Sequence, residues 1–542
     1  MDENNENKKM TYRRSTRHLD KKFHKVGFES EDNDFQHQLS RKALTHDTDF
    51  DEESENEREL PISRSSFFSN SFSHLQLLIF SVILSLTFYS CPFFNRVATG
   101  SAAVNLYAGF GMNHGVTPYN ELFGSSGPLF YLVNQIGAAT GSTLILWLCE
   151  IIVLWGSGVM AFDIIQEMLN KKSLSTVIAA STMLAIAGIS LGGDQGIVFA
   201  LPFALYGVRV LNRYFIDDKA VKDEVFILFG ISGALASLFF PLFLVIWVIG
   251  ALGLFGRNIS LRNFGRGFYQ LLAGVFGFLL VFSVAGYYTL TTQIFFPTIE
   301  QAVILPFTHL NVSASGAINL AISLLLVLLF GLLSSWFYGF YYAANGSHRI
   351  WSGVLLFVGI LSLIFVSFMQ SYSPAFALVI LPFSFMFIGL HVDREMLRQR
   401  SSFGEALSKY IRAAAILPVL GLIFLVAYPV ADTMLNSSYI SSERAVAAYV
   451  KKQSTSSDQV TVLSNSLEIN RLARRASDVT LPPSYYPASY NQAVSINIST
   501  AKSKYVVVDN KLDLSDSLKS MLSSNYKNVK FGDTHFKIYQ IK

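Results

Sequence analysis

Long apolar stretches recur along this chain from Leu75 onward, and they constrain its fold more than any other feature. The hydrocarbon layer of a bilayer is about 30 Å thick, so a helix needs roughly 20 apolar residues to cross it. The stretches that approach this length are 75–94, 141–165, 173–190, 197–215, 225–238, 240–256, 268–288, 317–343, 350–369, 375–392 and 412–430. We therefore expect an α-helical polytopic membrane protein with about eleven transmembrane helices.

Charge divides the chain into three parts. Residues 1–70 carry 28 charged side chains, basic first and acidic later, whereas residues 71–430 carry only 29 and residues 431–542 carry 23. Soluble domains are about 25% charged, so only the two ends have the composition of water-exposed protein. We predict a disordered cytoplasmic tail (1–70), a transmembrane domain (71–430) with a long first outer loop (95–140), and an extracytoplasmic domain (431–542).

The positions of the basic residues predict the orientation. If the N-terminus is cytoplasmic, all Lys and Arg residues of 71–430 except Arg96 fall on the inner side, as the positive-inside rule requires. An odd number of helices then leaves the C-terminal domain outside the cell. We expect a multi-pass protein of the cell membrane in this orientation.

The last 112 residues have the pattern of a small α/β domain. Residues 459–464 and 505–509 are short β-rich runs, and residues 535–541 alternate like an edge strand. Helical patterns at 442–451 and 514–523 fall between them.

The loops on the expected outer side hold the candidate site residues, because the inner loops are short and basic. Glu121 stands in the long first loop, and Asp194 stands on a glycine-rich backbone in the second. We expect these two to be the catalytic acids and, if a metal is bound, its ligands. A structural alternative is open for each: Glu121 would cap the turn at Pro118-Tyr119, and Asp194 would cap the helix after it. Expected substrate contacts are Asn105, Tyr119, Gln195, Glu300, His309, Gln370 and Tyr372.

One further carboxyl group, that of Glu150, lies inside a predicted membrane span. A charged side chain is costly there and indicates either function or a buried partner. For Glu150 we favour a protonated or hydrogen-bonded structural role.

The first loop resembles that of a known family. The succession G-x-x-P-Y-N-E-x-F-x-x-x-G-P-L-x-Y, from Gly115 to Tyr131, is similar to the same loop in bacterial C-type glycosyltransferases. These multi-pass enzymes are related to protein O-mannosyltransferases and the aminoarabinose lipid A transferase. The later features follow in the same order: a G-G-D-Q loop at 192–195, Q-A-V-I-L-P-F at 301–307, a Tyr-Ser-Pro turn before residue 381, and a closing α/β domain. The resemblance covers about residues 75–542.

The resemblance implies a GT-C-like fold and the transfer of a sugar from a polyprenyl-phosphate donor to an acceptor at the outer membrane face. The acceptor would be a glycan, a lipid or a protein of the cell envelope, and no nucleic acid is involved. An acceptor hydroxyl needs a carboxylate base, and the leaving phosphate needs positive charge or a divalent cation such as Mg²⁺ or Mn²⁺.

The sequence departs from this family at the start of the loop. The family usually places Asp or Glu about where Gly100, Ser101 or Asn105 stands, but no acid occurs between Phe93 and Asn120. This departure keeps open a non-catalytic scaffold that binds polyprenyl lipid or a partner enzyme. A transporter or flippase is a third reading, although the paired half-repeats typical of transporters are not evident.

Overall fold

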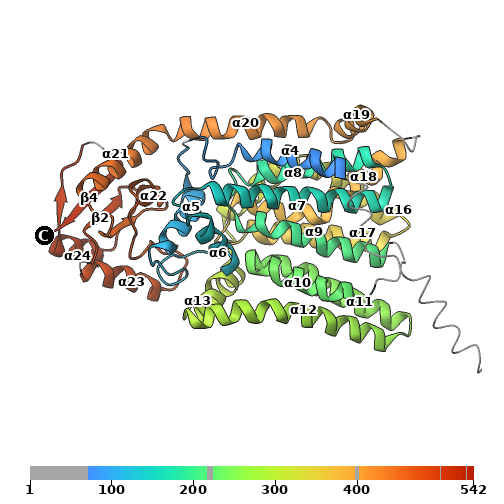
Figure 1. The fold of residues 1–542 in the computed structure, drawn as a ribbon, viewed down its shortest axis with the longest axis horizontal. Helices are drawn as coiled ribbons and strands as arrows, with labels where there is room; N and C mark the ends of the chain where they lie inside the picture. Colours follow the sequence, from blue (N-terminus) through green and yellow to red (C-terminus); the bar gives the residue numbers. More distant parts are fainter. Residues whose placement is uncertain are drawn as a thin grey trace, which may run out of the picture. The chain divides into compact units, whose positions relative to one another are not determined.

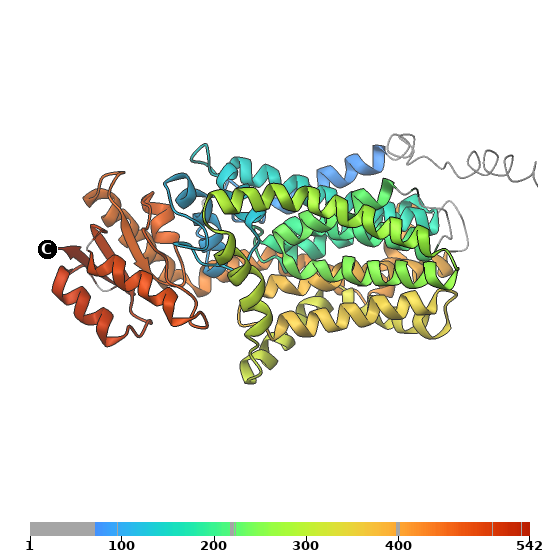
Figure 2. The same cartoon turned by 90° about the horizontal axis from the view of Figure 1, so that it is seen from below.

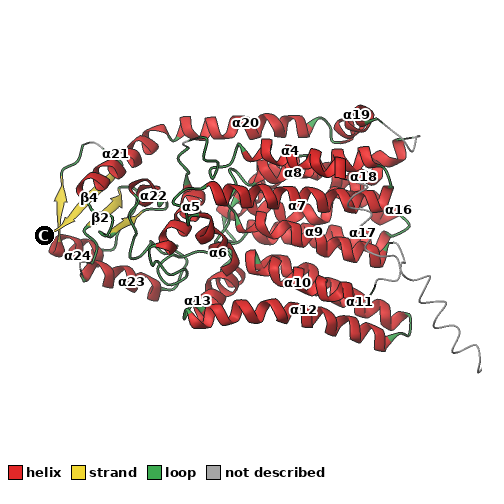
Figure 3. Cartoon of the chain, in the orientation of Figure 1, coloured by secondary structure: helices red, strands yellow, loops and turns green. Residues whose placement is uncertain are grey.

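The computed structural model describes residues 71–542 except 95, 217–221, 223, 397–401, 501 and 533 (Figure 1). The predicted tail, 1–70, lies outside the described residues. Residues 70–542 form one compact unit, in which helices of the membrane domain precede a small sheet near the C-terminus (Figure 3).

Helices dominate the chain up to residue 435. Their bounds are Ser71–Ser85 (α4), Gly100–Asn113 (α5), Pro128–Gly137 (α6), Leu144–Leu169 (α7), Lys172–Ile189 (α8), Gly196–Phe215 (α9), Glu224–Phe239 (α10), Pro241–Phe243 (η1, a 3-10 turn), Leu244–Ser260 (α11), Phe264–Thr291 (α12), Phe295–Ile299 (α13), Glu300–Ile304 (η2, a π-helical turn), Leu305–Thr308 (α14), Ala314–Leu329 (α15), Leu332–Asn345 (α16), Arg349–Ser367 (α17), Pro374–Ile380 (η3, a 3-10 helix), Leu381–Glu395 (α18), Phe403–Ala413 (α19) and Leu417–Leu435 (α20). Two of them, α5 and α6, lie within the predicted first outer loop.

Each of the eleven predicted stretches contains a helix, although the stretch 75–94 is helical only to Ser85, and several meet the requirement for crossing a bilayer. Among the described helices, seven are long and apolar enough: α7, α8, η1 with α11, α12, α17, η3 with α18, and α20. The stretch predicted at 317–343 is not one straight helix, because α15 and α16 meet at an angle of 85°. Gly331, with a φ of +76°, permits this break. The helices α4 and α10 are shorter, with 15 and 16 residues, so the total of eleven spans stays a prediction.

Glycine allows helices α10 and α12 of the membrane domain to pack closely. A Cβ added to Gly230 on α10 would lie 1.8 Å from the carbonyl oxygen of Gly274 on α12, and one added to Gly277 would lie 2.1 Å from that of Ile227. Small residues let helix backbones approach closely in membranes. In Figure 2, α12 consequently runs along the side of the bundle beside α10 and α11.

The C-terminal part consists of four helices and a four-stranded sheet. The helices are Ser437–Gln453 (α21), Glu468–Ala473 (α22), Ala488–Ser499 (α23) and Asp516–Asn525 (α24), and the strands are Val460–Leu463 (β1), Tyr505–Asp509 (β2), Tyr526–Val529 (β3) and Phe536–Ile541 (β4). The strand order is β1-β2-β4-β3; β1 and β2 pair in parallel and the other pairs are antiparallel. The strands predicted at 459–464 and 505–509 and both predicted helices are therefore confirmed.

The prediction of an edge strand at 535–541 was wrong. β4 pairs with β2 on one side and β3 on the other, so it is an inner strand. The edge strands are β1 and β3, and β3, which flanks β4, is a four-residue strand whose central residues, Lys527 and Asn528, are exposed. Its short, polar sequence carries no alternating pattern, so it gave no strand signal.

Candidate functional site

A cavity of about 1100 Å³ lies between the first loop, the turn before η3 and the C-terminal domain. Its wall consists mainly of serine, asparagine, glutamine, tyrosine and proline side chains. Asp513 is the one carboxylate in this wall among the described residues, and no described Lys, Arg or His contributes to it. The cavity therefore offers hydrogen bonds to a ligand but almost no charge.

The first loop is held in place by its own turn and by a buried glutamine. Tyr119 is buried with a φ of +65°, and its hydroxyl donates a hydrogen bond of 2.7 Å to the carbonyl of Ser126. The side chain of Gln301 is also buried, and its amide donates to the carbonyl of Tyr119. Gln301 Oε1 in turn accepts from the N–H of Gly124 at 3.4 Å. Tyr119 thus supports the loop and does not line the cavity.

Glu121 caps the turn beside it. Its Oε2 accepts a hydrogen bond of 2.7 Å from the N–H of Thr117. This is the turn-capping role that the sequence offered as the alternative to catalysis. Its backbone carbonyl accepts from the N–H of Thr480 at 2.7 Å and from the Thr480 hydroxyl at 2.9 Å. Thr480 lines the cavity, but Glu121 does not.

Asp194 is fully buried beside Glu150. Its backbone N–H donates to Glu150 Oε1, and the hydroxyl of Ser90 donates to Glu150 Oε2. Asp194 Oδ1 accepts from Asn134 Nδ2 at 3.0 Å. The cap of α9 is Gln195, so Asp194 does not serve as the helix cap proposed as its alternative. Burial raises the pKa of Asp194 above its usual range, and the hydrogen bond from Asn134 opposes this rise.

Glycine lets the second loop pass directly over Glu150. Leu191, Gly192, Gly193 and Asp194 all have positive φ angles. A Cβ on Gly193 would lie 2.6 Å from Glu150 Oε1, so only glycine fits there. The G-G-D-Q sequence is therefore explained by the close approach of this loop to a buried carboxyl group.

An apolar groove of about 590 Å³ runs beside the cavity along α10, α11, α12 and α13. Its wall is almost entirely hydrocarbon and includes Pro128, whereas Ser126, two residues earlier, lines the polar cavity. A second apolar groove of about 280 Å³ shares Leu244, Val248 and Phe278 with the first. The polar cavity and the apolar groove are thus lined by residues only two positions apart in the chain, Ser126 and Pro128.

Comparison with family models assigns the chain to a protein family. The model of the competence-induced Ccs4 N-terminal domain matches residues 64–437, and the model of the Ccs4 C-terminal domain matches residues 441–542. The chain belongs to the Ccs4 family. No curated protein matches its sequence.

Solved structures show the fold of this Ccs4 chain. It is similar to crystal structures of ArnT from Cupriavidus metallidurans in the apo state (TM-score 0.60) and bound to undecaprenyl phosphate (TM-score 0.56). In both, the identity is 11%, and the match covers 86% of this chain and 97% of ArnT. The cryo-EM structure of arabinofuranosyltransferase AftD from Mycobacteria matches 86% of this chain and 40% of AftD at 12% identity, with a TM-score of 0.47. The GT-C-like fold and the multi-pass membrane architecture expected from the sequence are confirmed.

Four of the nine predicted site residues of this Ccs4 chain line the cavity: Asn105, Gln195, Gln370 and Tyr372. The amide of Asn105 also donates to the backbone carbonyl of Asp194 at 2.7 Å, and the hydroxyl of Tyr372 donates to the backbone carbonyl of Asn319 at 3.1 Å. The structure therefore brings together the amide and phenol groups predicted for substrate contact.

The other predicted residues lie outside the cavity wall. Glu300 accepts a hydrogen bond of 2.5 Å from the hydroxyl of Tyr490, and His309 lies in the exposed turn after α14 with its ring 6.5 Å from that of Tyr485. Glu121 and Asp194 have separate partners and share no contact. A divalent cation held by both does not fit this arrangement, and the described residues contain no group of three or more His, Cys, Asp or Glu side chains placed to hold a metal.

The sequence did not predict three residues of the candidate site. Asn134 on α6 binds Asp194, Tyr485 lines the cavity, and Asp513 is its carboxylate. A signal was present only for Tyr485, which stands in the P-P-S-Y-Y-P run at 482–487, typical of an ordered aromatic loop.

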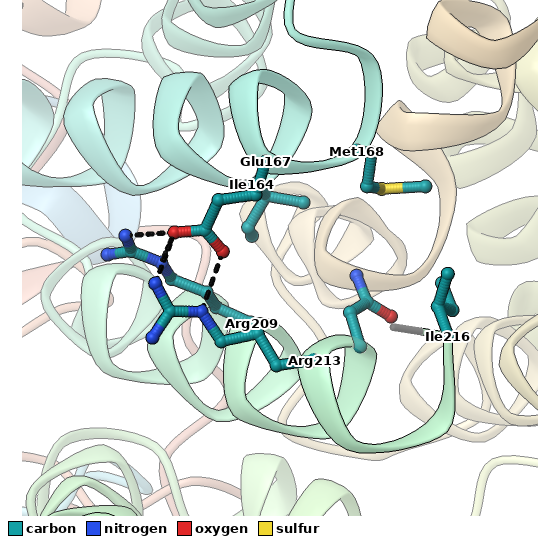
Figure 4. Close-up of a pocket in the computed structure, with 7 residues that line it drawn as sticks. Ile164, Glu167, Met168, Arg209, Arg213 and Ile216 are labelled. Carbon is teal, nitrogen blue, oxygen red and sulfur yellow. Dashed lines mark hydrogen bonds and ion pairs between the residues drawn. The ribbon is translucent and has the colours of Figure 1, made fainter. Parts of the chain in front are cut away.

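A second cluster of charged residues is structural. Glu167 on α7 accepts hydrogen bonds from Arg209 and Arg213 on α9 (Figure 4). Arg209 also pairs with Asp163 at 2.9 Å. The hollow at this point has a volume of only about 10 Å³. It is too small for a ligand larger than a water molecule, so the cluster joins the two helices.

Proposed function

We propose that this protein is a membrane glycosyltransferase that takes a sugar from a polyprenyl-phosphate-linked donor and passes it to a cell-envelope acceptor. The observation that carries this proposal is the junction of the polar cavity with the apolar groove at Ser126 and Pro128. A lipid-linked sugar has the same division: its isoprenoid chain suits a hydrocarbon groove, and its hydroxyl-rich head suits amide and hydroxyl groups. ArnT, which shares the fold, has been crystallised bound to undecaprenyl phosphate.

The proposed orientation has a cytoplasmic N-terminus and an extracytoplasmic C-terminal domain, which supports placing the reaction at the outer face. It rests on the basic residues of the loops expected on the inner side. The acceptor would then be a glycan, a lipid or an exported protein.

The proton of the acceptor hydroxyl has to go to a base at the cavity. Neither Glu121 nor Asp194 lines its wall, so we assign this role to Asp513, the carboxylate that does. Asp513 also forms an exposed ion pair with Lys519 at 3.2 Å. The leaving phosphate has no described Lys, Arg or His in the cavity wall to stabilise it.

The lipid part is tested by filling the groove. Gly286 lines it, and a Cβ added there meets no atom within 4 Å, so Gly286→Leu places hydrocarbon into the groove without a clash. Gly265→Leu on the same helix is the matched control, because it also has open space and lies outside both grooves. We expect Gly286→Leu alone to weaken binding of undecaprenyl phosphate to the purified protein, measured by native mass spectrometry. No binding by the unchanged protein would refute the lipid-linked donor.

The transfer is tested in cells that lack the protein and are complemented with variants. Ser495→Trp blocks the cavity, whereas Ser499→Trp on the same helix does not line it. We expect mass spectrometry of envelope glycans to show a missing sugar with the empty vector, Ser495→Trp and Asp513→Asn, and a normal profile with Ser499→Trp.

The scarcity of charge in the cavity favours one second candidate, a non-catalytic relative that binds polyprenyl lipid for a partner enzyme. It predicts undecaprenyl phosphate binding together with envelope glycans that Asp513→Asn leaves unchanged. The two assays above separate it from the transferase.

A further inference from the structure

In the buried pair Asp194 and Asn134, one side-chain oxygen of each residue lacks a hydrogen-bond partner. Asn134 Nδ2 donates to Asp194 Oδ1 at 3.0 Å, but Asp194 Oδ2 and Asn134 Oδ1 are both buried without a partner. Buried polar atoms are nearly always hydrogen-bonded, so two such oxygens on one contacting pair need an explanation. Both are acceptors, and neither can satisfy the other unless one of them carries a hydrogen.

We infer that Asp194 is protonated on Oδ2 and donates this hydrogen to Asn134 Oδ1, which makes Asp194 a positioning residue of the cavity and not its base. The carboxylic acid and the amide then form a closed pair with two parallel hydrogen bonds. A single proton satisfies both oxygens, and no further group is needed.

The contacts of Glu150 assign the proton to Asp194. Both oxygens of Glu150 already accept hydrogen bonds, one from the N–H of Asp194 and one from the hydroxyl of Ser90. Two buried carboxylates this close are not both ionised, because each would destabilise the charge of the other. The other side chains in contact with Asp194 and Glu150, from Asn105, Asn134 and Ser90, are neutral.

The raised pKa of Asp194 agrees with this geometry, since burial favours the neutral acid. The side chain is 0% exposed, and it lies outside the cavity wall. A proton held there is unable to exchange with a substrate hydroxyl.

The pair positions two residues that line the cavity. The carbonyl of Asp194 accepts from Asn105 Nδ2 at 2.7 Å, and Gln195 follows it in the chain. Because the loop 191–194 has four successive positive φ angles, its conformation depends on these side-chain contacts. The positioning role rests on the proposed function of the cavity, whereas the location of the proton does not.

The test is the substitution Asp194→Asn, which mimics the protonated acid. Asparagine keeps an acceptor at Oδ1 and a donor at Nδ2, so it can form both hydrogen bonds with Asn134. We expect the purified Asp194→Asn protein to have the Tm of wild type. Its Kd for undecaprenyl phosphate should stay within about twofold of the wild-type value. Asp194→Ala and Asn134→Leu, which cannot form the pair, are expected to lower the Tm and weaken binding.

Infrared spectroscopy locates the proton independently of function. We expect the difference spectrum between wild type and Asp194→Asn to contain the C=O band of a buried, slowly exchanging carboxylic acid, and the difference spectrum between wild type and Glu150→Gln to lack it. A difference spectrum between wild type and Asp194→Asn without this band, or an Asp194→Asn protein as unstable as Asp194→Ala, overturns the inference. If the wild type does not bind undecaprenyl phosphate, the proposed function fails, but the infrared and Tm results still decide the position of the proton.

Discussion

The backbone N–H and the hydroxyl of Thr480 both donate to the carbonyl oxygen of Glu121, at 2.7 and 2.9 Å. The C-terminal domain thereby binds the first loop at its only acidic residue, through the backbone. Two further contacts support this junction: the N–H of Ser477 donates to the hydroxyl of Tyr107 at 2.8 Å, and the ring of Phe123 packs edge-on against that of Tyr486. The cavity is consequently assembled from parts of the chain more than 350 residues apart in the sequence.

The role of Glu121 can be tested by charge removal. Glu121→Gln keeps an acceptor for the N–H of Thr117, so we expect the Tm and the envelope glycan profile of wild type. Glu121→Ala removes this acceptor and should cost about 1 kcal/mol of folding free energy, as loss of a capping side chain does. Thermal unfolding in detergent measures both. A Glu121→Gln protein with normal Tm but lost glycan would instead identify Glu121 as catalytic.

The second loop should not tolerate a side chain at Gly193. In Gly193→Ala the new Cβ would meet Glu150 Oε1 at 2.6 Å on a backbone with a φ of +82°, so we expect a loss of about 1–3 kcal/mol. Gly115→Ala is the matched control, because Gly115 has a φ of +92° but no neighbouring atom within 4 Å. The difference between their Tm values reports the steric contact. Equal values would mean that backbone strain alone limits this loop.

Glu443 should make stability depend on pH. It is buried on α21, and burial, opposed by a hydrogen bond from Ser466 and aided by nearby Glu468 and Asp509, raises its pKa from 4.5 to about 7. The folded protein holds this proton at a pH where the unfolded chain has lost it. The stabilisation is thus complete below pH 4.5 and is lost as the pH rises through about 7, by at most about 3 kcal/mol.

Glu443→Gln cannot lose this proton and still accepts from Ser466. Its Tm relative to wild type should therefore rise between pH 5 and pH 8, measured by thermal unfolding at closely spaced pH values. A constant difference over this range would contradict the raised pKa.

The charged cluster in Figure 4 should be needed for stability and not for ligand binding. Glu167→Ala leaves Arg213 without its carboxylate partner and Arg209 with Asp163 alone, so we expect a loss of about 1–3 kcal/mol. Glu405→Ala is the control, since Glu405 forms an exposed pair with Lys409 at 3.6 Å that should contribute less than about 1 kcal/mol. Binding of undecaprenyl phosphate by Glu167→Ala, measured below its Tm, should equal that of wild type.

The helices and the fully buried strands were predictable because their signals are local. Each predicted apolar stretch contains a helix, and the β-rich runs mark β1 and β2, whose residues are all buried. Interruptions are harder to predict from hydropathy. The 85° break between α15 and α16 falls at Phe330-Gly331, inside an apolar stretch that shows no change in composition.

The site was predictable in its neutral residues more than in its acids. Asn105 on α5, Gln195 before α9, and Gln370 and Tyr372 in the turn before η3 are far apart in the sequence, and the fold gathers them in one wall. Glu121 and Asp194 were singled out because acids are scarce in those loops. The scarcity of acids does not reveal where their side chains point. Each turns toward a backbone or amide donor nearby: the N–H of Thr117 for Glu121, and the amide of Asn134 for Asp194.

The short turn from Ser126 to Pro128 separates two chemically opposite compartments. Gly127 makes this separation thin, because its N–H donates to the carbonyl of Phe239 at 3.1 Å and a Cβ there would lie 2.1 Å from the carbonyl of Leu238. The residues that line the cavity and the residues that line the groove can therefore change independently during evolution. If the protein binds a lipid-linked sugar as proposed, substitutions in the serine- and asparagine-rich wall would change which head group is accepted, while the unchanged hydrocarbon groove would still bind the lipid tail.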